Sequence, residues 1–310
     1  MYLTENNVWY LKDLSYDGKL YHYTDETGYR GIIDSSKNFD NNISLRLTRI
    51  DCGAKDPLER KHIKETVQKV ADQLREEGCI TDTFHDLVKS YSPAITGSSM
   101  YATDSLDCST HVPQRILKID WGETAYYIGC FSTNPENQHI KTTFHTTRKI
   151  AFSQLFSALD DSYALQDVMR NGMHRVNYYN QLHPCKFLSA AFLDFYMKKV
   201  LYRDDEKEAL VKEALLEIFN AGVDWENQLG MMYYLYDGFF KTKEFEPENE
   251  VRLLVKVPRL NQYPKFWKEE YNIEFEDEKN CPRKYLYLPI SIDFLEQDSA
   301  DNIQRDRTLL

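Results

Sequence analysis

The sequence has few residues of the kinds that mark fibrous, unfolded or exported chains. Only 12 of its 310 residues are glycine and 10 are proline, which excludes collagen-like and low-complexity classes. The six cysteines stand singly, without a Cys-x-x-Cys pair, and the N-terminal stretch has no basic start followed by an apolar run. We therefore expect reduced thiols and a cytoplasmic location.

Long apolar runs and an excess of positive charge are missing as well. No stretch approaches the roughly 18 apolar residues that a membrane helix needs, so no membrane contact is expected. Lys and Arg number 38 against 49 Asp and Glu, which gives a formal net charge of −11. General nucleic-acid binding is therefore not expected, because a surface that binds nucleic acid is normally basic.

The chain does have enough apolar material for a core, since 42% of its residues are hydrophobic and 22 are Tyr. Its apolar spacing predicts an α+β protein with helices and strands intermixed. Strands are expected over 19–24, 43–47, 116–119, 126–131, 251–257 and 285–292. Helices are expected over 25–33, 56–78, 83–91, 144–159, 166–179, 186–202, 205–220 and 228–240.

The domain organisation follows from the same patterns. We expect one domain over 1–297, with helical insertions at about 56–113 and 144–240. The polar stretch 92–113 is interpreted as a loop, and 298–310 as a flexible tail.

Familiar catalytic motifs are absent from the sequence. There is no phosphate-binding Gly-x-x-x-x-Gly-Lys, no Gly-x-Gly-x-x-Gly after a strand, no His-Glu-x-x-His and no Gly-x-Ser-x-Gly. His183 and Cys185 form the nearest metal-like pair, but no second pair accompanies them. No metal site is therefore expected.

Four short segments stand out instead, at residues 20–24 (LYHYT), 55–59 (KDPLE), 130–132 (CFS) and 245–253 (FEPENEVRL). Their order and spacing resemble an uncharacterised bacterial family with a YHYT strand, an NDPxE segment, a CFS strand and a late EREWRL segment. The resemblance spans roughly residues 19 to 257. In this sequence Lys55 replaces the family's usual Asn, and Val251 replaces its usual aromatic residue.

The opening segment LYHYTDETGYRGII is also similar to the start of ADP-ribosyltransferase domains of the His-Tyr-Glu type. In that superfamily an early-strand His and a late-strand Glu face each other across a cleft that holds NAD. The resemblance implies a split mixed sheet with inserted and flanking helices, and it implies His22 and Glu250 as the catalytic pair. Glu248 and Glu250 also match the Glu-x-Glu spacing of some arginine-directed transferases, and in a strand both would share one face.

These residue types suit the chemistry that the resemblance implies. Cleavage of the nicotinamide–ribose bond develops positive charge on the ribose, as in glycoside cleavage. The carboxylate of Glu250 would stabilise that charge, and a neutral His22 imidazole would hydrogen-bond the ribose hydroxyls.

Further residues are expected to bind NAD. Arg46 or Arg252 would pair with its pyrophosphate, and a Tyr would stack on nicotinamide. The complete set expected to bind NAD is His22, Tyr23, Thr24, Arg46, Ser132 and Arg252. The stacking Tyr stays open among Tyr126, Tyr127, Tyr163 and Tyr178.

Each of these residues also has a structural interpretation. His22 suits a hydrogen-bonded core position in an aromatic strand, and residues 130–132 suit a buried strand. Residues 56–59 are explained by helix capping alone. Glu250 beside Arg252 suits a structural ion pair on one strand face.

The sequence favours an enzyme that takes NAD as its substrate. It would transfer ADP-ribose to an unknown macromolecular acceptor or act as an NAD glycohydrolase. The alternative is a non-catalytic nucleotide- or protein-binding module of the same fold, in a defence or toxin-related system. A third hypothesis is a phosphate-transfer enzyme of the tRNA-processing type. It would need several basic residues in its cleft, which the excess of acidic residues in the chain disfavours.

Overall fold

The structure is a computed structural model, and it describes residues 16, 18–34, 42–50, 59–91, 99–106, 113–153, 194–260 and 285–308. The chain divides into two compact units. Among the described residues, the first unit takes 59–91 and 198–249, and the second takes the remainder. The prediction of one domain over 1–297 stays a prediction.

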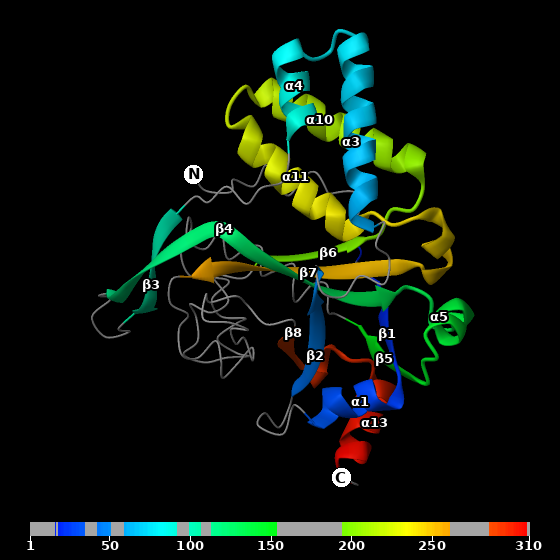
Figure 1. Cartoon of the computed structure of the whole chain (residues 1–310). Helices are drawn as coiled ribbons and strands as arrows, with labels where there is room; N and C mark the ends of the chain where they lie inside the picture. The colour runs from blue at the N-terminus through cyan, green and yellow to red at the C-terminus, as the bar shows by residue number, and fades with distance from the viewer. Residues whose placement is uncertain are drawn as a thin grey trace. The chain divides into compact units, whose positions relative to one another are not determined.

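The first unit is helical (Figure 1). Its helices are α3 (Glu59–Glu76), α4 (Asp82–Ser90), α10 (Asp204–Ala221) and α11 (Trp225–Phe239), followed by the 3₁₀ helix η3 (Lys243–Glu248). The four α-helices confirm sequence predictions. α3 buries Ile63, Val67, Val70, Ala71 and Leu74, the apolar positions that recur at three- to four-residue steps on one helix face.

Glycines end two of these helices. Gly78 has φ 71° and Gly222 has φ 67°, the left-handed conformation that follows many helix C-termini and favours glycine. Gly222 is the C-cap of α10 and its N–H bonds the carbonyl of Phe219 at 3.1 Å.

The second unit is built on an antiparallel sheet. Its strands are β1 (Leu20–Thr24), β2 (Asn42–Arg49), β3 (Ser99–Leu106), β4 (Pro113–Ser132), β5 (Arg148–Phe152), β7 (Glu250–Leu260) and β8 (Tyr285–Ser291). Strand β6 (Asp194–Lys199) pairs with β7. One path through the sheet runs β5-β1-β4-β2-β8, and β3 and β7 also pair with β4. The ladders β1–β4, β1–β5, β2–β4, β2–β8, β3–β4 and β4–β7 are all antiparallel, whereas the sequence analysis expects a mixed sheet.

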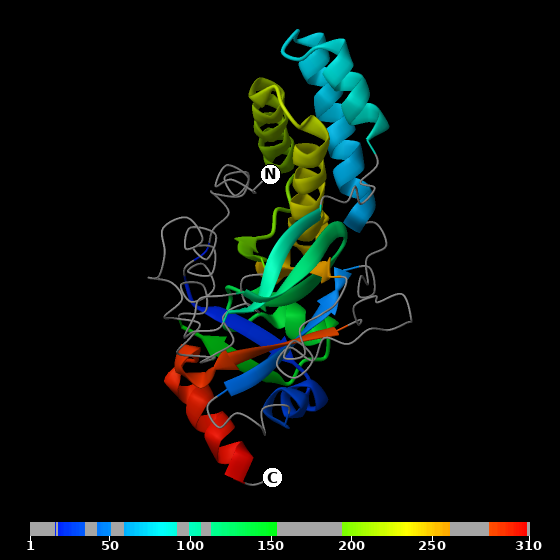
Figure 2. The same cartoon turned by 90° about the vertical axis from the view of Figure 1, so that its left-hand side faces the viewer.

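Short helices complete the second unit: α1 (Glu26–Asp34), α5 (Gln138–Thr143), η4 (Ile292–Phe294) and α13 (Gln297–Thr308). Asp25 Oδ1 accepts the N–H of Gly28 at 2.6 Å and so caps α1. The expected flexible tail is corrected, because α13 is a helix with Ile303 buried. The Tyr29 hydroxyl of α1 donates to Asp306 of α13 at 3.1 Å, and the two helices lie at the same end of the sheet (Figures 1 and 2).

One face of the sheet forms the core of the second unit. Leu45 and Leu47 of β2 and Phe131 of β4 are at most 2% exposed. Gly129 leaves room for Leu47, since a Cβ atom at Gly129 would lie 2.6 Å from Leu47 Cδ2. The strands predicted over 19–24, 43–47, 251–257 and 285–292 are confirmed.

Three predicted elements are wrong within the described residues. Residues 99–106 form strand β3 in place of a loop. Residues 148–152 form β5 and residues 194–199 form β6, where helices were expected. Short apolar runs suit either element, and pairing with β1 and β7 decides the outcome. The helix over 166–179 and residues 186–193 lie outside the described residues.

The strands predicted over 116–119 and 126–131 are one long strand, β4. Its pairing with β7 is irregular between Asp120 and Ala125. Such a bulge accommodates polar and glycine residues without ending the strand. The polar and glycine residues between 119 and 126 therefore made one strand look like two in the sequence. None of the described helices is long and apolar enough to cross a membrane.

Candidate functional site

Three strands bring Tyr21, Ser132 and Glu250 into one row. Tyr21 of β1 lies opposite Ser132 of β4, and Ser132 lies opposite Glu250 of β7. Residues directly opposite each other share a face of the sheet. The hydroxyl of Ser132 and the carboxylate of Glu250 are therefore cross-strand neighbours.

His22 occupies the other face of the sheet. It follows Tyr21 on β1, and successive residues of a strand point to opposite faces. Its ring lies 5.7 Å from the ring of Phe131, the residue before Ser132. The expectation that His22 and Glu250 share one cleft is therefore corrected: the strand register separates them. Thr24, two residues beyond His22, belongs to the His22 face by the same alternation.

The surroundings of His22 match its structural interpretation. Its Nδ1 lies 3.0 Å from the carbonyl oxygen of Cys130, so Nδ1 carries the proton and donates it. Desolvation by burial lowers the pKa of His22, and the hydrogen bond to Cys130 opposes that shift. The imidazole is consequently neutral near pH 7, held against the core strand β4.

Glu250 and Arg252 form a buried ion pair on β7. Arg252 Nε donates to Glu250 Oε1 at 2.9 Å, and their side chains are 3% and 4% exposed. Both residues lie on the Ser132 face, because Arg252 is opposite Cys130 and Glu250 is opposite Ser132. Arg252 therefore neutralises and orients the Glu250 carboxylate. The sequence analysis instead expected Arg252 to pair with the pyrophosphate of NAD.

The loop after β4 carries a hydrogen-bond network around Ser132. Ser132 Oγ accepts the Asn134 N–H at 3.1 Å and the Asn137 side-chain Nδ2–H at 3.2 Å. The Tyr23 hydroxyl donates to the Asn134 carbonyl at 2.7 Å and accepts the Asn137 N–H at 3.0 Å. Tyr23 thus shares the Ser132 face and fixes the loop. Sequence reasoning missed Asn137, although an Asn just before a short helix is an available signal for a cap.

The Glu-x-Glu interpretation does not hold. Glu248 ends the 3₁₀ helix η3, and Asn249 has φ 47°, so the strand begins only at Glu250. Glu248 Oε2 accepts from Lys241 Nζ at 2.7 Å, whereas Glu250 pairs with Arg252. The rule that strand residues two apart share a face therefore does not apply to these two glutamates.

Another expected ligand, Arg46, shares the face of Ser132, because Thr48, two residues further along β2, lies opposite Ile128 of β4. The guanidinium of Arg46 lies 4.8 Å from the centre of the Tyr285 ring, at the β2–β8 pairing. Tyr127 is fully buried, so it is not open to stack on nicotinamide. The side chain of Tyr126 and all of Tyr163 and Tyr178 lie outside the described residues.

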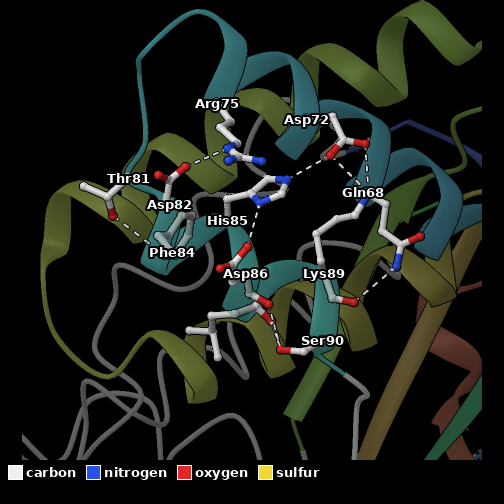
Figure 3. Close-up of polar contacts among 11 residues, drawn as sticks. Gln68, Asp72, Arg75, Thr81, Asp82, Phe84, His85, Asp86, Lys89 and Ser90 are labelled. Atoms are coloured by element: carbon white, nitrogen blue, oxygen red, sulfur yellow. Dashed lines mark hydrogen bonds and ion pairs between the residues drawn. The ribbon is translucent and has the colours of Figure 1, made fainter.

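A second polar cluster joins α3 to α4 in the helical unit (Figure 3). His85 Nε2 lies 2.8 Å from Asp72 and its Nδ1 lies 3.2 Å from Asp86. Lys89 Nζ donates to Asp72 at 2.8 and 3.0 Å. Both ring nitrogens of His85 face carboxylates, so this cluster ties two helices together rather than presenting a catalytic base.

No metal centre is evident in the part of the chain that the structure describes, which contains no group of three or more His, Cys, Asp or Glu side chains placed to hold an ion. The pair His183 and Cys185 lies outside it. No family model, no curated protein and no solved structure matches this chain.

Proposed function

We propose that this chain has an ADP-ribosyltransferase-like fold and acts on NAD, with Glu250 as the carboxylate beside the reacting ribose. The observation that supports the proposal is the direct cross-strand placement of Ser132 and Glu250. A carboxylate fixed beside a hydroxyl donor suits the positive charge that develops on ribose as nicotinamide leaves. The products would be ADP-ribose on a macromolecular acceptor or free in water.

Arg252 orients Glu250 in this proposal. Its Nε holds one carboxylate oxygen at 2.9 Å, and a charge-assisted hydrogen bond of this kind favours the ionised form. An ionised carboxylate is the form that stabilises an oxocarbenium-like ribose. His22, on the opposite face, holds β1 to β4 and takes no part in the reaction.

The burial of the pair sets a condition on substrate binding. The side chains of Glu250 and Arg252 are 3% and 4% exposed, so NAD can reach them only after a local rearrangement. We therefore expect NAD to associate more slowly than it would with a preformed, open site.

The second candidate function is a non-catalytic nucleotide- or protein-binding module of the same scaffold. The buried Glu250–Arg252 pair favours it, because a carboxylate neutralised inside a sheet is explained by structure alone. The separation of His22 from Glu250 favours it as well.

The experiment that separates these functions measures NAD binding by calorimetry and nicotinamide release by chromatography. We compare the wild type with Glu250→Gln and with the control Glu246→Gln, an exposed glutamate of η3. The enzyme proposal expects at least ~100-fold slower release for Glu250→Gln alone. Binding with equal release from all three proteins supports the non-catalytic module, and no binding at millimolar NAD overturns the NAD proposal.

A further inference from the structure

The outer edge of strand β5 is covered by residues that lie far along the chain. Ala151 of β5 donates its N–H to Ser299 Oγ at 3.0 Å, and its carbonyl oxygen accepts the N–H of Glu296 at 2.8 Å. Ser153, just beyond the end of β5, donates its N–H to the carbonyl of Phe294 at 2.9 Å. The backbone groups of this edge are therefore satisfied by the segment that leads into α13.

These hydrogen bonds take the place of a neighbouring strand. Phe152 of β5 and Leu295 form an antiparallel bridge. Backbone groups of successive strand residues point alternately to the two sides, so the N–H of Ile150 points toward β1, and the N–H of Ala151 points away from it. An uncovered strand edge of this kind is a template on which another strand can pair.

The covering segment, residues 294–308, buries little apolar surface of its own. Among its described side chains only Leu295 and Ile303 are buried, at 6% and 1% exposed. Its other contacts are polar: the Tyr29 hydroxyl donates to Asp306 at 3.1 Å. The ion pair that Glu296 makes with Lys19 has side chains 27% and 59% exposed, and exposed pairs of this kind contribute little to stability.

The strands beneath the segment are anchored more firmly. Leu20 of β1 and Ile150 and Phe152 of β5 are each at most 1% exposed, and β1 and β5 pair along five residues. Parts of a protein with few buried apolar contacts open at a lower free energy than its core. Residues 294–308 meet that description and the β1–β5 ladder does not.

We propose that residues 294–308 form a strap that releases from the edge of β5 as one unit, while β5 stays paired with β1. Release uncovers both backbone groups of Ala151 and the N–H of Ser153, and an edge opened in this way can accept an extended strand. The strap thus determines whether this edge of the sheet is closed or open. This inference is independent of the reaction with NAD.

The test is native-state hydrogen exchange of the full chain, measured by NMR at the amides of Ala151, Ser153 and Ile150. Ile303→Ala removes the most buried side chain of the strap and leaves the hydrogen bonds at the edge in place. We expect exchange at Ala151 and Ser153 to accelerate by the same factor, roughly 30-fold or more, which corresponds to the low end of the cost of such a truncation. Exchange at Ile150 should not change.

Two further variants separate the strap from its individual contacts. Gln304→Ala alters the exposed neighbour of Ile303 and should change exchange at both edge amides by no more than about 2-fold. Ser299→Ala removes the acceptor of the Ala151 N–H and weakens the strap. It should accelerate Ser153 by roughly 2- to 10-fold and Ala151 by more, again without a change at Ile150.

Unchanged or unequal exchange at Ala151 and Ser153 in Ile303→Ala overturns the proposal. Equal acceleration at Ile150 also overturns it, because the strap would then open only together with the sheet. If Ile303→Ala does not fold, Ser299→Ala decides: an acceleration confined to Ala151 contradicts release as one unit. All of these measurements are made without NAD, so their outcome is separate from that of the proposed function.

Discussion

Arg252 Nε donates to Glu250 Oε1 at 2.9 Å, and neither side chain is more than 4% exposed. The two residues flank Val251 on β7, so their side chains share one face of the strand, and the fully buried Leu254 follows them on that face. Two charges in such a place depend on each other, because either one alone would be a buried, uncompensated ion.

The first prediction concerns this pair. Arg252→Met is expected to lower the free energy of unfolding by about 3–5 kcal/mol, since it leaves the Glu250 carboxylate buried without its cation. The double variant Glu250→Leu/Arg252→Met is expected to be more stable than Arg252→Met. Urea unfolding measures both, with Arg203→Met, which removes an exposed pair with Asp205, as a control expected to cost much less. A double variant less stable than Arg252→Met alone would argue against the mutual dependence.

The second prediction concerns His22 and pH. Because burial lowers its pKa in the folded chain, only the unfolded chain takes up a proton as the pH falls below about 6.5. The free energy of unfolding should therefore decrease from about pH 6.5 down to the lower pKa of the folded state. His22→Asn keeps a donor for the Cys130 carbonyl but does not titrate in this range. The variant should therefore lack this decrease in the free energy of unfolding. Urea unfolding between pH 7.5 and 5.5 tests it, and identical pH dependence in both proteins contradicts it.

The third prediction concerns Asp72 in the helical unit. Hydrogen bonds from His85, then Lys89, lower the pKa of Asp72. Its contribution to stability is thus present above the unfolded pKa of about 4 and is lost as the pH falls through the lower folded pKa. Asp72→Asn should cost at most about 1 kcal/mol at pH 7, since the carboxylate is 47% exposed. The deficit should shrink in acid, and a deficit that is constant with pH refutes the assignment.

The fourth prediction compares two glycines. Gly129→Ala should lower the free energy of unfolding by about 1–3 kcal/mol, because its Cβ would meet Leu47 Cδ2 at 2.6 Å in a filled core. Gly31→Ala, in α1 with nothing within 4 Å, should raise it by about 0.5–1 kcal/mol. Thermal or urea unfolding measures both, and effects of the same sign would be the contradictory result.

Local patterns predicted much of the fold. The alternation of Ile43, Leu45 and Leu47 predicts a half-buried strand, and β2 buries all three. The spacing of Ile63, Val67 and Leu74 predicts α3 in the same way. The helix predicted over residues 148–152 was wrong. A short apolar run is compatible with both a helix and a strand, and here the pairing with β1 makes it a strand.

The candidate site was less predictable for a physical reason. His22, Ser132 and Glu250 are more than 100 residues apart from one another in sequence, and their faces depend on how β1, β4 and β7 pair. A shift of one residue in that register would exchange the faces. Motif letters identified the residues, but only the pairing shows that Glu250 neighbours Ser132 and not His22.

The central claim is that a dinucleotide reacts at the Ser132–Glu250 face of the sheet. The most direct measurement is an experimental structure of the protein with bound NAD or a non-cleavable NAD analogue. We expect the nicotinamide ribose to lie within hydrogen-bond reach of the Glu250 carboxylate, with His22 still bonded to the Cys130 carbonyl. A dinucleotide bound against His22 on the opposite face, or a Glu250–Arg252 pair that stays closed with the ligand elsewhere, would contradict it.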